Sequence, residues 1–262
     1  MKAIVITGST RGIGYGLAEA FLQQGCTVTV SGRKEESVDQ AVEKLVQRFG
    51  RERVYGHACD VSEPAQLQAL WDSSRQVFGK VDIWISNAGI ANPLGKLWEQ
   101  PEETMESVIQ TNVLGAIYSA KTALNGMFAQ GYGGLYTMLG FGSSGRQQDG
   151  LLLYGTSKAA VRYFSDGLAK EVEGTSVLVG ALSPGMVVTD MMTGSRRTSP
   201  QTWERVKRVL NLLGDRVETI APWFAKQILE NQKNGVEIRW LTTGKLMWRV
   251  ITSPFIKRKI IS

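Results

Sequence analysis

Short apolar runs alternate along the chain with longer segments in which apolar residues recur about every three or four positions. The short runs are typical of buried strands, and the periodic segments are typical of amphipathic helices. The pattern predicts strands at 3–6, 26–30, 54–58, 81–85, 135–139, 177–182 and 235–241. It predicts helices at 14–24, 35–49, 65–78, 102–130, 154–173, 202–213 and 219–230.

This alternation indicates strand–helix–strand crossovers, which generate parallel sheets. We therefore expect a Rossmann-like, doubly wound α/β fold of about seven parallel strands with helices on both faces. No internal repeat, low-complexity stretch or linker divides the chain, so residues 1–262 are predicted to form a single domain. Residues 186–262 are its predicted substrate-covering and C-terminal segment. Within it, 186–200 has a flexible composition and 245–261 is apolar, basic and irregular.

The charge of the chain is concentrated at its C-terminal end. The net charge is 30 − 24 = +6, yet residues 240–262 contain five Lys and Arg and no acid, which leaves 25 − 24 = +1 for the rest. A nearly neutral body does not indicate a nucleic-acid surface. Two hypotheses remain open for 240–262. It forms a substrate lid continuous with a peripheral membrane contact, or it packs over the core of the domain with solvated lysines.

Cysteine and histidine content excludes several kinds of site. Cys26 and Cys59 lack metal-ligand spacing, so no metal is expected, and a Ser-His-Asp hydrolase would have to use the single histidine, His57. The sequence enters a strand pattern at once, and its apolar runs are too short to span a bilayer. These features predict a cytoplasmic, reducing location, with membrane association only through 240–262.

A glycine-rich loop joins the first predicted strand to the first predicted helix. It reads Thr7-Gly8-Ser9-Thr10-Arg11-Gly12-Ile13-Gly14. Glycines let the backbone approach a pyrophosphate closely, and the helix N-terminus offers free N–H groups and a positive dipole end. The loop therefore predicts a dinucleotide-binding site.

Further motifs follow this loop in a fixed order. They are Cys59-Asp60-Val61, Asn87-Ala88-Gly89, Asn112 in a helix, Tyr154-Gly155-Thr156-Ser157-Lys158, and Pro184-Gly185 with Thr189. Over about residues 1–190 the chain resembles the short-chain dehydrogenase/reductase family, with Ser86 in place of the first Asn of the family's Asn-Asn-Ala-Gly. The resemblance implies an oxidoreductase that uses a nicotinamide dinucleotide. It also implies a homodimer or homotetramer that associates through the helices at 102–130 and 154–173.

Tyr154 and Lys158 are four residues apart on a predicted helix, so their side chains share a face. A tyrosine that exchanges a proton with a carbonyl oxygen needs its pKa lowered from about 10, and a nearby ammonium favours the phenolate. We therefore predict a lowered pKa for Tyr154. The resemblance implies that Lys158 also holds the nicotinamide ribose and that Asn112 supports a proton relay through water.

The serine that polarises the substrate carbonyl is displaced in this chain. The family places it about 13 residues before the tyrosine, where this sequence has Phe141, whereas Ser143 and Ser144 lie 11 and 10 residues before Tyr154. We predict Ser143 as the donor. Ser144, or no serine at all, stays an alternative. The predicted catalytic residues are Asn112, Ser143, Tyr154 and Lys158.

The end of the second predicted strand indicates which dinucleotide is bound. NAD-dependent enzymes of this fold usually place an acid there, but this chain has Ser31-Gly32-Arg33. Arg11 and Arg33 offer guanidinium groups to a 2′-phosphate, which predicts NADP(H) and reduction as the direction. The predicted cofactor-binding residues are Gly8, Ser9, Thr10, Arg11, Gly12, Ile13, Gly14, Ser31, Arg33, Asp60, Val61, Asn87, Ala88, Gly89, Tyr154, Lys158, Pro184, Gly185, Val187 and Thr189.

Three segments, 137–143, 154–158 and 183–190, look most like the chlorophyll b reductase branch of the family, apart from Thr137 where the branch has Asn. This resemblance implies a hydrophobic small-molecule substrate, and in its narrowest form the formyl group of a chlorophyll b-like tetrapyrrole. For Met191 and Met192, in the predicted covering loop 191–200, two hypotheses stay open: they line a substrate pocket, or they belong to ordinary packing, which is the commoner role. A general acyl-chain, steroid or xenobiotic ketone reductase and a non-catalytic NADP(H)-sensing protein remain alternatives.

Overall fold

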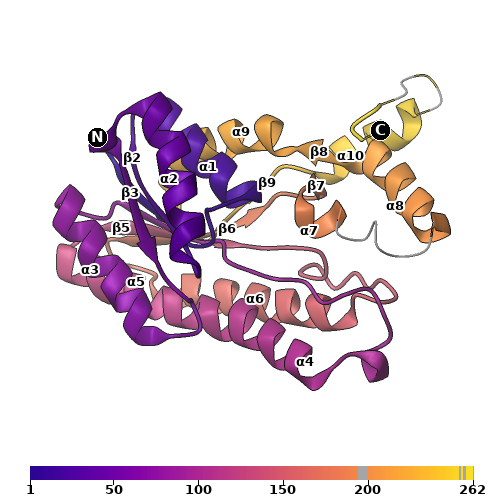
Figure 1. The fold of residues 1–262 in the computed structure, drawn as a ribbon, viewed down its shortest axis with the longest axis horizontal. Coiled ribbons are helices and arrows are strands. Elements are labelled where there is room, and N and C mark those ends of the chain that lie inside the picture. Colours follow the sequence, from indigo (N-terminus) through magenta and orange to yellow (C-terminus); the bar gives the residue numbers. More distant parts are fainter. Residues whose placement is uncertain (194–199, 254, 256–257, 262) are drawn as a thin grey trace.

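Seven strands pair in parallel to form one sheet, in the order β3-β2-β1-β4-β5-β6-β9 (Figure 1). The computed structural model describes residues 1–262 apart from 194–199, 254, 256–257 and 262. The strands are β1 (Ala3–Ile6), β2 (Thr27–Gly32), β3 (Val54–Ala58), β4 (Ile83–Ser86), β5 (Gly133–Met138), β6 (Val177–Ser183) and β9 (Val236–Arg239). The predicted Rossmann-like α/β class and the seven parallel strands are confirmed.

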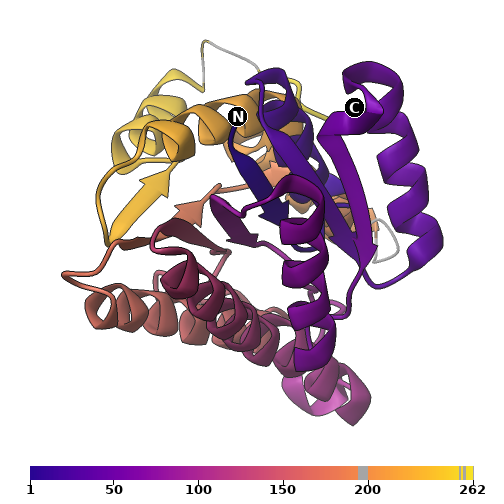
Figure 2. The same cartoon turned by 90° about the vertical axis from the view of Figure 1, so that its left-hand side faces the viewer.

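Helices cover both faces of this sheet, as the view in Figure 2 shows. The apolar sides of α1, α2 and α9 pack on one face, and those of α3, α5 and α6 pack on the other. The bounds are α1 (Gly12–Gln23), α2 (Glu35–Phe49), α3 (Pro64–Phe78), α4 (Glu102–Ile109), α5 (Gly115–Gln130), α6 (Leu152–Glu171) and α9 (Val217–Glu230), with short helical turns at Arg51–Arg53 and Leu97–Glu99. Each helix buries the apolar stripe that its sequence period predicts.

The order of the strands reverses at β1, because β2 lies on one side of it and β4 on the other. A parallel sheet with such a reversal opens a crevice at the carboxyl ends of its strands, where ligands bind. The loops that follow β1, β4, β5 and β6 all leave the sheet at this edge. These four loops carry most of the predicted site residues.

The predicted helix 102–130 is not regular throughout. Between α4 and α5 the backbone forms a π-helical turn, Gln110–Leu114, in which Asn112 is buried. Such turns are rare and occur frequently at functional sites. The sequence period does not reveal the turn, because one widened turn barely changes the spacing of the apolar residues.

The C-terminal part is more ordered than its composition indicates. It contains β7 (Val187–Val188), α7 (Asp190–Thr193), α8 (Pro200–Leu213), β8 (Asp215–Arg216) and α10 (Thr243–Thr252). The prediction of irregular structure over 245–261 is therefore wrong up to residue 252. There the Thr242 hydroxyl accepts a hydrogen bond from the Lys245 N–H at 3.2 Å and caps α10. Most of the predicted covering loop, 194–199, lies outside the described residues.

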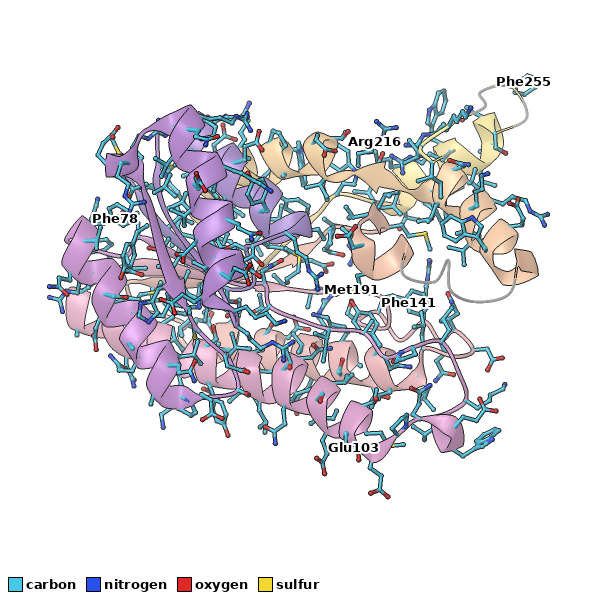
Figure 3. The ribbon with its side chains drawn as sticks, in the orientation of Figure 1. Phe78, Glu103, Phe141, Met191, Arg216 and Phe255 are labelled. Carbon is cyan, nitrogen blue, oxygen red and sulfur yellow. The ribbon has the colours of Figure 1, made fainter. Side chains whose placement is uncertain are left out.

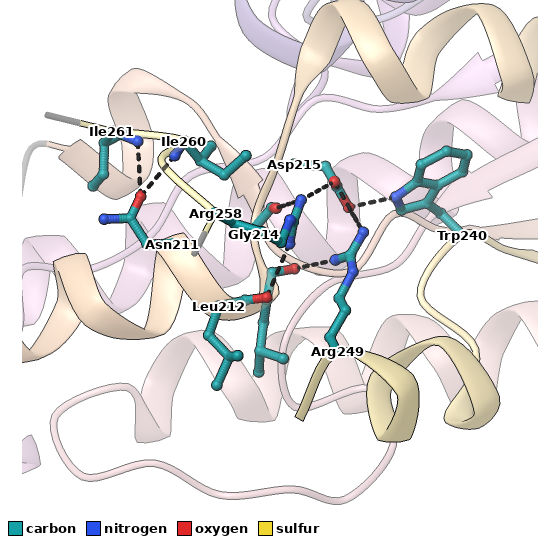
Figure 4. Close-up of polar contacts among 10 residues, drawn as sticks. Asn211, Leu212, Gly214, Asp215, Trp240, Arg249, Arg258, Ile260 and Ile261 are labelled. Atoms are coloured by element: carbon teal, nitrogen blue, oxygen red, sulfur yellow. Dashed lines mark hydrogen bonds and ion pairs between the residues drawn. The ribbon is translucent and has the colours of Figure 1, made fainter. Parts of the chain in front are cut away.

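One buried carboxylate connects α8, β8 and the C-terminal segment (Figure 4). Asp215 accepts hydrogen bonds from Arg249 at 2.7 and 2.9 Å, from Arg258 at 2.7 Å and from the Trp240 indole at 2.7 Å. The two guanidinium groups also donate to the carbonyl oxygens of Leu213 at 2.7 Å, and of Leu212 and Gly214 at 2.9 and 2.8 Å. They thereby cap the C-terminus of α8, where unpaired carbonyl groups gather.

This cluster removes two of the five cations of the tail from the lipid contact of the first hypothesis, and it does not contradict packing of the tail over the domain with solvated lysines. The guanidinium groups of Arg249 and Arg258 are neither solvated nor free for lipid phosphates, because Asp215 and the end of α8 bind them. Within the part of the chain that the structure describes, no helix combines the length and the apolar character needed to cross a bilayer.

We predict that Asp215→Asn lowers the free energy of unfolding by about 3 kcal/mol, because it leaves two largely buried guanidinium groups without a counter-charge. Urea denaturation measures the loss. Asp166→Asn is the matched control. Asp166 pairs with Arg162 on the exposed side of α6, and an exposed pair contributes less than about 1 kcal/mol. Equal losses in the two variants would contradict the prediction.

Candidate active site

The glycine-rich loop after β1 is packed too closely for side chains. Gly8 and Gly12 have φ values of +63° and +58°, in the left-handed region that favours glycine. A Cβ atom on Gly8 would lie 2.8 Å from the Ala88 Cα atom, and one on Gly14 would lie 2.5 Å from the Asn87 amide nitrogen. The loop thus forms a bare backbone surface at the N-terminus of α1, which fits the pyrophosphate of a dinucleotide.

Several predicted cofactor-binding residues hold this loop in place. The Asn87 amide donates to the carbonyl oxygens of Thr7 and Gly8 at 2.9 and 3.0 Å. The Ser9 hydroxyl donates to the Ile6 carbonyl at 2.6 Å and accepts from the Ser31 N–H at 2.9 Å. The polar groups of Asn87 and Ser9 are therefore engaged within the protein, and their contribution to binding is to fix the shape of the loop.

Two more of the predicted cofactor-binding residues, Thr189 and Asp60, follow β7 and β3 in the chain. Thr189, beyond β6, approaches Gly12, since a Cβ there would lie 3.6 Å from the Thr189 methyl group. The segment after β6 therefore passes over the phosphate loop. On the β3 side, the Asp60 carboxylate accepts from the Ser62 N–H and hydroxyl at 2.9 and 2.7 Å, so it is held at the start of α3.

Positive charge is available near the end of β2. Arg11, beside the phosphate loop, and Arg33, directly after β2, are both exposed. Neither forms an ion pair with another described residue. The neighbouring Ser31 hydroxyl is buried and lacks a hydrogen-bond partner in the described part of the chain. This arrangement offers cations and a hydroxyl where an NAD-binding protein usually has a carboxylate.

Asn112, Tyr154 and Lys158 converge from α6 and the π-helical turn. The Asn112 amide accepts from the Ile90 N–H at 2.8 Å and donates to the Ile90 carbonyl at 2.8 Å. It also donates to the Ser157 hydroxyl at 2.9 Å, so it joins the loop after β4 to α6. A Cβ on Gly89 would lie 3.2 Å from the Asn112 oxygen and 3.4 Å from the Lys158 Nζ atom, which places both at one spot.

Burial controls the pKa values of the tyrosine and the lysine. Lys158 is 5% exposed and donates to the Met138 carbonyl at 3.1 Å, and its Nζ atom lies 6.0 Å from the centre of the Tyr154 ring. Burial raises the pKa of Tyr154 to about 12 and lowers the pKa of Lys158 to about 8. The predicted lowering of the Tyr154 pKa is therefore wrong for the protein alone. The cause is the loss of hydration of the phenolate on burial.

The loop after β5 is pressed against the first turn of α6. A Cβ on Gly140 would overlap the Tyr154 hydroxyl, and one on Gly142, whose φ is +96°, would overlap the backbone of Gly155. The next residue, Ser143, is half-buried, whereas Ser144 is exposed. The packing thus favours Ser143 over Ser144 as the neighbour of Tyr154, and its role as a donor stays a prediction.

Asn92 is a residue of this site that the sequence does not indicate. Its side chain is buried, accepts from the Tyr154 N–H at 3.1 Å and donates to the carbonyl oxygens of Pro93 and Gly150 at 2.8 and 3.2 Å. It therefore anchors the turn of α6 that carries Tyr154. The pair Asn92-Pro93 signals a turn, but no local pattern identifies a partner 62 residues away.

Two apolar residues belong to segments that follow strands at the carboxyl edge of the sheet. Phe141 lies in the loop after β5, and Met191 lies in α7, which follows β7 (Figure 3). The nearby loops are joined by the ion pair between Lys96 and Asp149 at 2.7 Å and by the hydrogen bond from the Gly95 N–H to the Gly150 carbonyl. The side chain of Met192 lies outside the described residues.

Comparison with known proteins agrees with this geometry. A model of the short chain dehydrogenase family matches residues 2–200. Chlorophyll(ide) b reductase NOL of Oryza sativa subsp. japonica, a chloroplastic protein, is 36% identical over 258 residues, which are 95% of this chain and 74% of NOL. The probable chlorophyll(ide) b reductase NYC1 of Arabidopsis thaliana, also chloroplastic, is 31% identical over 268 residues, 96% of this chain and 53% of NYC1. The chain thus spans about half the length of NYC1.

Solved structures share the fold. A 3-ketoacyl-(acyl-carrier-protein) reductase from Brucella melitensis complexed with NADH gives a TM-score of 0.80 at 21% identity, covering 94% of this chain and 98% of that one. A closed serine dehydrogenase complexed with NADP+ gives 0.77 at 26% identity, covering 90% and 94%. The two structures hold different dinucleotides, so the likeness does not distinguish NAD from NADP.

The buried lysine predicts a measurable dependence of stability on pH. Between pH 8 and 10.5 the unfolded chain binds more protons than the folded chain, because the Lys158 pKa is about 8 in the fold against an ordinary 10.5. The contribution of Lys158 to the free energy of unfolding therefore rises as the pH increases across that window. We predict that Lys158→Met is about 3 kcal/mol more stable at pH 7 and lacks this rise, as urea denaturation at a series of pH values measures.

Lys121→Met is the control for this experiment, since Lys121 is exposed on α5. The free energy of unfolding of this variant should show the same pH dependence as that of the parent protein. A rise of the same size in Lys158→Met as in the parent would show that Lys158 is not the group responsible.

Proposed function

The chain belongs to the short-chain dehydrogenase/reductase family, and we propose that it reduces the carbonyl group of a hydrophobic aldehyde or ketone with NADPH. The observation that carries the proposal is the convergence of Tyr154, Lys158 and Asn112 beside a glycine cradle for a dinucleotide. In its narrowest form, the substrate is the formyl group of a chlorophyll b-like tetrapyrrole. The identity to the two chlorophyll(ide) b reductases supports this form.

Each site residue has a separate role in the proposed reduction. The phosphate loop after β1 would hold the NADPH, which when bound would supply a hydride for the carbonyl carbon. Tyr154 gives its proton to the carbonyl oxygen, and Ser143 donates a hydrogen bond to the same oxygen. The raised pKa of Tyr154 keeps the phenol protonated, which is the form that reduction requires. Lys158, when protonated, stabilises the phenolate that remains, and Asn112 fixes α6 relative to the loop after β4.

Two further parts of the proposal concern assembly and location. We retain self-association through α5 and α6 as a prediction by analogy with the family. A cytoplasmic location also stays a prediction, because both similar reductases are chloroplastic proteins. A non-catalytic NADP(H)-sensing role is the alternative that the turnover experiment below tests.

We predict that the protein with NADPH turns over members of a panel of aldehydes, ketones and formyl-bearing chlorins, and that Tyr154→Phe lowers kcat at least about 10²-fold by removing the proton donor. The rate of NADPH oxidation measures this. Tyr163→Phe is the matched control. Tyr163 lies on the same helix with its side chain 85% exposed, so this variant should keep the parent rate. NADPH binding without turnover of any substrate would favour the sensing role.

The same assay identifies the carbonyl-polarising serine. Ser143→Ala should lower kcat by about 10²-fold, the usual effect of removing one such donor, with NADPH binding unchanged. Ser144→Ala should leave kcat unchanged, since Ser144 is exposed. The reverse result would move the role to Ser144, and two unaffected variants would leave Tyr154 as the single donor.

Cofactor choice is tested separately. We predict that Arg33→Ala weakens NADPH binding by about 10- to 100-fold, because a charge-assisted hydrogen bond to the 2′-phosphate is lost, while NADH binding changes by less than about twofold. Isothermal titration calorimetry measures both. Arg75→Ala, on the exposed side of α3, is the control. A parent protein that prefers NADH would overturn the roles of Arg11 and Arg33.

A further inference from the structure

Helix α10 is oriented opposite to an ordinary surface helix. Its arginine, Arg249, is 8% exposed and lies inside, whereas most of its large apolar side chains face outward. The outward residues, together with one that follows the helix, are Met247 (56% exposed), Trp248 (64%), Val250 (51%), Ile251 (65%) and Phe255 (87%). We call these five residues the α10 surface. Exposed apolar side chains gathered in this way mark an interaction site rather than chance exposure.

The Asp215 cluster fixes this orientation. Arg249 lies within α10 and Arg258 lies just beyond it, and both bind Asp215 (Figure 4). Turning the apolar residues inward would pull the buried Arg249 guanidinium away from the Asp215 carboxylate and leave two buried charges unpaired. The outward apolar face is therefore a built feature of the fold and not the result of a frayed end.

The charge around the α10 surface is positive. Residues 240–262 contain no acid, and the two arginines outnumber the one carboxylate beneath the helix. Arg216 and Lys259 are exposed, and Lys245 is half-exposed above the Trp240 ring. A second copy of the chain on a twofold axis would bring these cations against their own copies, at a cost in repulsion. A surface of anionic groups over an apolar layer complements both the charge and the apolar residues.

We propose that the α10 surface docks on an anionic lipid bilayer, with the five apolar side chains inserted among the headgroups and the surrounding cations against lipid phosphates. This inference stands independently of the reaction proposed above. If both hold, docking brings the reductase to the phase in which a hydrophobic substrate is concentrated.

The test is sedimentation of the full chain with vesicles. Phosphatidylcholine vesicles that contain phosphatidylglycerol should bind the protein at least about tenfold more strongly than phosphatidylcholine alone, and added salt should weaken the binding. The triple variant Trp248→Ser, Ile251→Ser, Phe255→Ser should lose at least about tenfold in binding. Lys259→Ala should lose about fivefold, the usual effect of one cation near a charged membrane.

Matched controls come from the same chain. Trp98 is 81% exposed on the turn Leu97–Glu99, so Trp98→Ser removes an equally exposed tryptophan and should bind like the parent. Lys233→Ala, also exposed, should do the same. NADPH binding by the triple variant checks that it is folded.

Three outcomes would overturn the proposal. The first is equal binding to neutral and anionic vesicles, and the second is full binding by the triple variant. The third is an absence of vesicle binding together with self-association that the triple variant loses in analytical ultracentrifugation, which would assign the α10 surface to a second copy of the chain.

Discussion

The site depends on backbone segments that approach each other more closely than side chains allow. Gly8 and Gly14 bring the phosphate loop against the segment after β4, and Gly140 and Gly142 bring the loop after β5 against α6. At Gly8, Gly14 and Gly142, an added Cβ atom would lie too close to backbone atoms or to a side-chain amide that is already hydrogen-bonded. Because the loops leave neighbouring strands at one edge of the sheet, the glycines join them into a single surface. The shape of that surface fits a dinucleotide beside the tyrosine hydroxyl.

The same close packing explains the chemistry of the buried pair. Removing water around Tyr154 and Lys158 raises the pKa of the first and lowers the pKa of the second, so both neutral forms are favoured. A neutral phenol is a proton donor, which suits reduction. The protein therefore carries a destabilising buried lysine at the place where, in the proposed reduction, a developing phenolate needs a cation. Such an exchange of stability for activity is common at active sites.

The sequence is informative where the signal is local. Strand and helix periods predict the seven strands and most helices, and the Tyr154–Lys158 spacing places two side chains on one face of α6. Hydrogen-bond partners that are distant in the sequence cannot be predicted from local patterns. Asn92 binds the Tyr154 N–H from 62 residues away, and Asp215 meets Arg249 and Arg258 across 34 and 43 residues. The predicted lowering of the Tyr154 pKa is wrong because residue spacing indicates the neighbour of a group but not its burial.

In the C-terminal segment, one buried carboxylate reverses which side of a helix faces the protein and which side faces solvent. The apolar residues of α10 would ordinarily turn toward the core, and Arg249 toward water. The Asp215 carboxylate binds the Arg249 guanidinium inside the fold, and the same guanidinium donates to the Leu213 carbonyl at the end of α8. Arg249 therefore both caps α8 and fixes the orientation of α10. The outward apolar face of α10 and the C-terminal end of α8 therefore share one anchor, which is the Asp215 carboxylate with its two bound guanidinium groups.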